Sequence, residues 1–310
     1  MKNIFKVLSI VAVVVVTVIL SGCREDEPSS QSIFNEDSTP KTEFDYWILK
    51  NFTNPYNIRI IYRYVDKETN SSYNVVPTEE SKARGMAIIL RHVWLDAYNE
   101  VMEDVDSNFM KKYSPKLFKF IGSKMIDSTG KETLGDASGG SIINFTNVNS
   151  IDLDNPYVDV DSKLPSKGEP MDMNYWFFKT MHHEFCHILT QTKNYNTDFK
   201  TIAVGTYIPD DWHNRTDGEM VVEGFVSAYA SSESNEDFAE TYAYYVTHSE
   251  TAYQELLTLA GETGADKIKQ KVEFIRSYCN DVWGMDLDKV REVFIRRALE
   301  VPNMDLRTLD

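Results

Sequence analysis

The spacing of apolar residues predicts different elements in different parts of the chain. Between Tyr56 and Tyr64 large apolar side chains alternate with polar ones, which predicts a strand, and residues 73–76 are expected to pair with it. Residues 44–51 have the pattern of a short amphipathic helix. From Ala83 to Val101 the apolar positions follow one helical face, so we expect this helix to pack on the sheet.

The middle of the chain has two more strand patterns, followed by a helical one. Residues 116–125 and Gly139 to Phe145 are expected to be strands. Met173 to Thr190 has helical periodicity, and Asp172 is a plausible N-cap. Residues 191–217 lack any period, which predicts a loop.

The last third of the chain is predicted to be mainly helical. Ser234, with Asp237 three residues later, resembles a capping box that opens a helix. From Thr251 onward the pattern stays helical, with expected breaks near Gly261 and Gly284. Strands that precede a long helical part favour an α+β fold, with an N-terminal mixed sheet and a helical C-terminal part.

The N-terminal segment has the features of an export signal. Lys2 and Lys6 precede an apolar run that ends at Leu20, and this run is shorter than the roughly 20 residues of a membrane-spanning helix. The Leu-Ser-Gly-Cys sequence at 20–23 resembles the lipobox of bacterial lipoproteins. The resemblance implies removal of residues 1–22 and lipidation of Cys23, which would anchor the chain to a membrane. An ordinary signal peptide with a chance cysteine is the alternative.

The segment after Cys23 divides the expected domains. Residues 23–42 are rich in Ser, Asp, Glu, Thr and Pro, which predicts a flexible tether. The acidic stretch at 24–27 resembles the signal that sends some lipoproteins to the outer face of the outer membrane. The expected folded domain is 43–310, with a sheet-containing lobe at 43–170 and a mainly helical lobe at 171–310.

Charge and cysteine content exclude some classes of function. The chain has 310 residues and a formal net charge of −16, so nucleic acid and anionic membrane surfaces are poor partners. With Cys23 assigned to lipid, only two of the three cysteines are left, which excludes a disulfide framework. The sequence leaves open whether Cys186 and Cys279 pair, and Cys186 is expected to be a small core residue.

The strongest chemical signal is the His-Glu-Phe-Cys-His sequence at 183–187. On a helix, residues four apart lie on one face, so the imidazoles of His183 and His187 can reach one metal ion with Glu184 beside them. This H-E-x-x-H pattern predicts a zinc hydrolase of the zincin kind, with the active-site helix at a cleft. Glu184 is too displaced to bind the ion and is expected to act as the general base.

A catalytic zinc ion needs a third protein ligand and one open position. The metzincin pattern requires glycine and histidine where Thr190 and Lys193 stand, which excludes that branch. Glu236 and Glu240 share one face of a predicted helix, so one can bind zinc while the other accepts the N–H of a ligating histidine. Glu219 and Glu223 are rival ligands, but they lack this paired context.

The segment from Glu236 to Tyr242 resembles the third-ligand helix of lethal-factor-type zinc peptidases. That resemblance implies that Glu236 is the zinc ligand, which leaves Glu240 in the second shell. A tyrosine seven residues before the ligand supports the reaction in that group, and Tyr229 stands at this offset. Tyr229 is therefore expected to stabilise the oxyanion of the transition state.

Taken together, the lipobox, the stretch at 51–58 and the two helical motifs resemble the substrate-import-associated zinc metallohydrolase lipoproteins, also described as zinc-binding metallopeptidases. The resemblance implies a gluzincin-like peptidase with one zinc ion, anchored to the outer membrane and exposed at the cell surface. It also implies protein or glycoprotein substrates and a link to outer-membrane nutrient-import components. By analogy, the strand at 139–145 would line the cleft and pair with an extended substrate.

Two classes of function follow from the sequence. The first is a cell-surface zinc metallopeptidase. The second is a non-catalytic surface binding lipoprotein that keeps a structural zinc ion. Glu184 favours the enzyme, because a structural site has no use for a general base at that position.

Overall fold

The computed structural model describes residues 41–63, 73–126, 132–133, 142–164 and 167–310. The expected signal segment, the lipidation site Cys23 and nearly all of the expected tether lie outside these ranges. From Thr42 onward the chain forms one compact unit. Within the described ranges, no helix combines the length and apolarity that crossing a bilayer requires.

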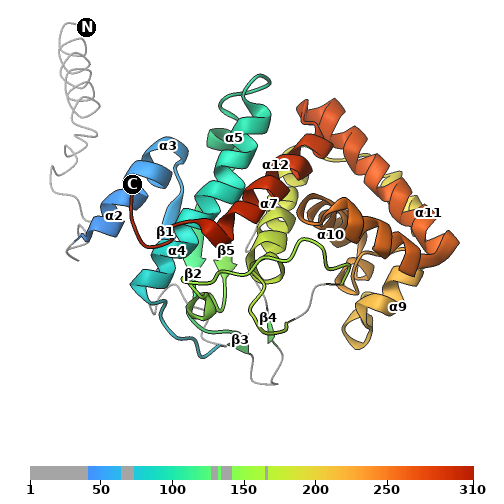
Figure 1. Ribbon diagram of the computed structural model, residues 1–310. Coiled ribbons are helices and arrows are strands. Elements are labelled where there is room, and N and C mark those ends of the chain that lie inside the picture. Colours follow the sequence, from blue (N-terminus) through green and yellow to red (C-terminus); the bar gives the residue numbers. More distant parts are fainter. Residues whose placement is uncertain (1–40, 64–72, 127–131, 134–141, 165–166) are drawn as a thin grey trace, which may run out of the picture. The chain divides into compact units, whose positions relative to one another are not determined.

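A small parallel sheet forms the β part of the fold (Figure 1). Its three strands lie in the order β1 (Arg59–Ile61), β2 (Leu117–Phe120) and β5 (Ile142–Phe145). A separate antiparallel pair joins β3 (Met125–Ile126) to β4 (Glu132–Thr133). The α+β fold class is therefore confirmed, although the main sheet is parallel instead of mixed. Parallel neighbours need a long crossover, and the predicted helix between β1 and β2 supplies it.

The helices that precede β2 follow the predicted pattern closely. The stretch expected at 83–101 is a nearly continuous helix, and the stretch expected at 44–51 is helical as well. The elements of this part are α2 (Glu43–Ile48), η1 (Leu49–Thr53), α3 (Asn54–Tyr56), α4 (Glu80–Leu90), η3 (Arg91–Leu95), α5 (Asp96–Met102) and α6 (Phe109–Tyr113).

The predicted strand pair near the N-terminus is wrong in two respects. The strand expected from Tyr56 begins only at Arg59, because α3 extends to Tyr56 and Asn57 then turns the chain with a φ of 56°. Residues 73–76 do not pair with β1. Instead, the carbonyl of Val76 accepts from the backbone N–H of Gly122, beside β2. The part of the predicted Gly139–Phe145 strand before Ile142 lies outside the described residues.

The long helix in the middle of the chain consists of η5 (Asn174–Phe178) and α7 (Lys179–Thr192). As predicted, Asp172 caps its start, because its carboxylate accepts the backbone N–H groups of Asn174 and Tyr175. Phe185 on α7 packs edge-to-face on Trp94, which packs in the same way on Phe118 of β2. These aromatic contacts place α7 against the core that it shares with the sheet and the crossover helix.

The C-terminal part is helical, and α7 packs most extensively on α10 (Figure 1). The short η4 (Val148–Ser150) follows β5. The remaining elements of the C-terminal part are α8 (Phe199–Ile202), η6 (Trp212–Asn214), α9 (Asp217–Val222), η7 (Tyr229–Ser231), α10 (Ser234–Thr247), α11 (Glu250–Trp283), α12 (Leu287–Glu300) and η8 (Val301–Asn303). The predicted breaks lie at Gly261, which kinks α11 with a φ of 68°, and at Gly284, which ends it with a φ of 65°. The stretch at 191–217 contains two short helices in addition to loop.

The predicted capping box of α10 is wrong. Glu233 is the N-cap, and no side chain caps this end of the helix. Asp237 is fully buried and pairs with Lys271 of α11 at 2.7 Å. A buried carboxylate needs a partner of opposite charge. The Asp237 side chain therefore pairs with Lys271 and does not take part in capping the helix.

Candidate metal centre

Helix α7 presents the two histidines of the motif on one face. His183 and His187 are one turn apart, and their Nε2 atoms lie 3.0 Å from each other. His183 is buried, and His187 is partly exposed. Two imidazole nitrogens that converge at this distance are arranged to share one cation.

Helix α10 brings the third group to the same point. The Oε2 atom of Glu236 lies 3.1 Å from Nε2 of His183 and 3.3 Å from Nε2 of His187. A tetrahedral zinc site with bonds of about 2.0 to 2.1 Å has ligand atoms about 3.3 Å apart. The three side chains therefore fit a zinc ion in both chemistry and spacing. Among the described residues, they are the one group of acids, histidines or cysteines that could hold a metal.

Glu240 lies one turn after Glu236 and supports His183 from behind. Its Oε1 atom lies 2.9 Å from Nδ1 of His183, the ring nitrogen that faces away from the three converging atoms. Its Oε2 atom accepts hydrogen bonds from Lys179 at 2.6 Å and from the hydroxyl of Ser227. Glu236 thus lies with the two histidines, and Glu240 contacts the far side of the His183 ring; which acid binds a metal stays a prediction.

The two other partners of Glu240, Lys179 and Ser227, were not predicted from the sequence. Lys179 precedes His183 by one turn on the same helix, which was a usable signal, because a lysine on a mostly buried helix needs an acidic partner. Ser227 lies in the turn before η7 and had no sequence signal of its own.

The carboxylates shift the pKa values of the cluster. Burial alone would lower the pKa of His183, but the neighbouring Glu236 and Glu240 carboxylates raise it to about 10. Burial would raise the pKa of Glu236, yet the hydrogen bonds from the two histidines hold it well below its usual range. The cluster thus favours an ionised Glu236 carboxylate beside a protonated His183, at the point where a divalent cation would bind.

The side chain of Tyr229, from η7, contacts the ring of His183. The two rings are stacked, with centroids 5.9 Å apart, and Trp212 packs edge-on against the tyrosine at 4.9 Å. Burial, together with the nearby Glu236 carboxylate, raises the pKa of Tyr229. Like any tyrosine, it is protonated at neutral pH, so its hydroxyl can donate a hydrogen bond.

Glu184 is partly buried on α7, next to His183. Its negative charge contributes to the raised pKa values of His183 and Tyr229, so it acts on both sides of the cluster. The rival acids lie elsewhere. Glu219 accepts the backbone N–H of Thr216 in an exposed capping box, and Glu223 is exposed after α9.

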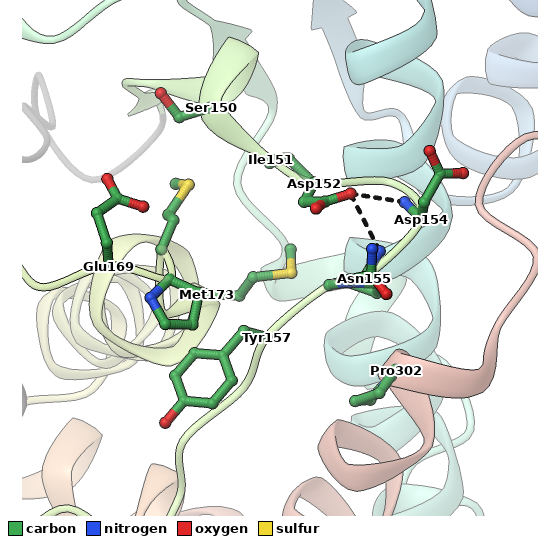
Figure 2. A pocket seen from close by; sticks show the side chains of 12 residues that line it. Ser150, Ile151, Asp152, Asp154, Asn155, Tyr157, Glu169, Met173 and Pro302 are labelled. Carbon is green, nitrogen blue, oxygen red and sulfur yellow. Dashed lines mark hydrogen bonds between the residues drawn. The ribbon is translucent and has the colours of Figure 1, made fainter.

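The two remaining cysteines are free and buried, which agrees with the expectation that Cys186 is a core residue. A pocket of about 460 Å³ contains no residue of the histidine motif in its lining. Figure 2 shows the side chains that line it. Its lining includes Asp152, Tyr157 and Glu169, and none of the three candidate metal ligands belongs to it. Asp152 accepts hydrogen bonds from the backbone of its own loop, at Asp154 and Asn155.

Two comparisons with known proteins found matches. The profile of the family described as "Putative zinc-binding metallo-peptidase" matches residues 37–288. A solved structure from Bacteroides caccae, described in the same words, shares 36% sequence identity with this chain. The match covers 90% of this chain and 100% of that one, with a TM-score of 0.71. No curated protein matches the chain.

Proposed function

The chain belongs to the zinc-binding metallo-peptidase family whose profile it matches, and from this premise we propose that it hydrolyses peptide bonds with one zinc ion held by His183, His187 and Glu236. The observation that carries the proposal is the convergence of these three ligand atoms beside Glu184. Among the described residues, only these three protein groups converge, which supports a catalytic site with an open position over a closed structural one.

The ion and the protein divide the chemistry. Zinc at this site would act as a Lewis acid toward water and a substrate carbonyl. Glu184, next to His183 on α7, then takes the proton of the attacking water and passes it to the leaving amine. Tyr229, whose ring stacks on that of His183, donates its phenolic hydrogen to the oxyanion that develops on the carbonyl.

The cellular setting is part of the proposal. The lipobox at Cys23 and the acidic residues after it support a lipid-anchored protein on the outer face of the outer membrane. A peptidase at that place would act on proteins or glycoproteins near a nutrient-import system. The β5 strand, at one edge of the three-stranded sheet, is the candidate to pair with an extended substrate.

A peptide library tests the proposed activity. The full chain purified in detergent should cleave a subset of the peptides, lose that activity in a chelator and regain it when zinc is added back. The E184Q variant should cleave none of them while still binding one zinc ion. Cleavage that survives both the chelator and E184Q would contradict the proposal, as would the absence of cleavage by zinc-loaded chain of any protein, glycoprotein or peptide substrate.

A further inference from the structure

A single buried carboxylate connects the candidate ligand His183 to the segment that carries Tyr229. Glu240 is 5% exposed, so water cannot replace the groups around it. One of its oxygens faces Nδ1 of His183, and the other accepts from Lys179 and Ser227. Three different elements thus meet at one side chain.

Ser227 extends this connection toward the tyrosine. It is 5% exposed, and its hydroxyl donates to Glu240 while accepting the backbone N–H of Ala230 at 3.1 Å. Next to it, Asp217 accepts the backbone N–H of Ala228 at 2.7 Å. Tyr229 lies between Ala228 and Ala230, whose backbone N–H groups donate to Asp217 and Ser227. The position of the Tyr229 ring therefore depends on both hydrogen bonds.

Lys179 supplies the positive charge that this arrangement needs. Three carboxylates, from Glu184, Glu236 and Glu240, lie around the two histidines. A divalent cation and the ammonium of Lys179 together balance them. Without Lys179 the buried Glu240 carboxylate would lose its charged partner, and breaking such a pair is costly because an unpaired charge remains.

We propose that Lys179 and Ser227 are positioning residues that act through Glu240, Lys179 on the metal-binding orientation of His183 and Ser227 on the Tyr229 segment. Lys179 and Ser227 both donate to the same oxygen of Glu240, Oε2. The inference rests on the proposed zinc site. It predicts two separable effects, one on zinc affinity and one on turnover.

A double-mutant cycle on zinc affinity tests the role of Lys179. Outer partners of ligating histidines typically contribute 10- to 100-fold in metal affinity, so E240Q should weaken zinc binding by about that factor. K179M acts on His183 only through Glu240, so it should weaken zinc binding by up to the same factor. The double variant should bind no worse than E240Q alone, because without Glu240 the lysine has nothing to hold. The glutamine amide can then donate to the Ser227 hydroxyl.

K163M is the matched control, because Lys163 forms a surface ion pair with Glu255 at 3.0 Å. It should leave zinc affinity unchanged. Fold-changes that multiply in the double variant would overturn the proposal, as would a K179M affinity within twofold of the parent. If K179M does not fold, which a missing cooperative unfolding transition would show, the K179M/E240Q double variant serves as the test. This double variant should fold and bind zinc like E240Q. If it does not, Lys179 has a purely structural role and the proposal is overturned.

Turnover measurements test Ser227. S227A should lower kcat by about tenfold or more while KM and zinc affinity stay near the parent values, and S227T, which keeps the hydroxyl, should restore most of the loss. A loss of zinc affinity equal to that of K179M, or no rescue by threonine, would overturn this assignment. Zinc affinity can be measured whether or not the chain cleaves peptides. A parent chain that binds zinc without cleaving peptides would therefore contradict the proposed function and leave the Lys179 cycle interpretable.

Discussion

Oε2 of Glu236 lies 3.1 Å from Nε2 of His183, although the two residues belong to different helices. The contact exists because α7 and α10 pack along their length, so a face of one helix meets a face of the other. The site is thus a product of helix packing. Changes that leave this packing intact should separate metal binding from catalysis.

The first prediction concerns the general base. E184Q keeps the size of the side chain and removes its ability to take a proton. We expect kcat to fall by about 10² to 10⁴ with zinc content and thermal stability unchanged. Steady-state kinetics and metal analysis measure the two quantities, and E262Q, at an exposed position of α11, is the control. An active E184Q would remove Glu184 from the mechanism.

The second prediction concerns the oxyanion donor. Y229F keeps the ring that stacks on His183 and removes the hydroxyl. Loss of one such donor typically lowers kcat by about 10² to 10³, and we expect this loss with KM and zinc affinity nearly unchanged. Y46F, at a residue that is 60% exposed, should have no effect. A fall in zinc affinity alone would instead give Tyr229 a packing role.

The third prediction concerns protons released on metal binding. The pKa of His183 is raised to about 10 by its carboxylate neighbours, so the imidazole carries a proton at pH 8. A metal ion must displace that proton, because only the neutral ring can bind it. Calorimetry in buffers of different ionisation enthalpy should report about one proton released per zinc ion at pH 8. Buffer-independent heats would contradict this protonation state.

Much of the site was predictable from sequence because its signals are local. His183, Glu184 and His187 lie within one turn of helix, and the Glu236 and Glu240 pair repeats that spacing. Residue types and spacing left open which of the two acids binds a metal, and only a resemblance pointed to Glu236. Partners that only tertiary packing brings together could not be predicted in this way.

Asp237 and Lys179 illustrate this limit. Asp237 has the spacing of a capping residue, yet Lys271 lies 34 positions away in the sequence and pairs with it in the core. Lys179 likewise meets Glu240 across 61 positions. The predicted strand pairing of residues 73–76 was wrong for a related reason. These residues have strand character, but they lie beside β2 and do not pair with β1. Local pattern identifies an element and does not choose its neighbour.

The fourth prediction concerns acid stability. His248 is fully buried beside Tyr244, and burial lowers its pKa to about 3. The unfolded chain binds a proton below a pKa of about 6.5 while the folded chain does not, so stability is lost as pH falls from about 6.5 toward 3. One such group contributes up to about 1.4 kcal/mol per pH unit to the free energy of unfolding.

H248N removes this titration and keeps a donor for the Tyr244 carbonyl, which lies 2.9 Å from Nδ1. Its free energy of unfolding should therefore depend less steeply on pH between 4 and 6.5, as measured by urea unfolding in a chelator. The exposed H213N variant should keep the parent slope. Equal slopes for the parent and H248N would show that His248 takes up a proton in the folded chain.

The central claim is that one zinc ion sits among His183, His187 and Glu236. An anomalous difference map, collected at the zinc edge from crystals grown with zinc, tests it most directly. We expect one strong peak at about 2.0 to 2.2 Å from both Nε2 atoms and a Glu236 oxygen, with a non-protein ligand in the remaining position. A map with no peak at these three side chains, or with a fourth protein ligand on the ion, would contradict the account.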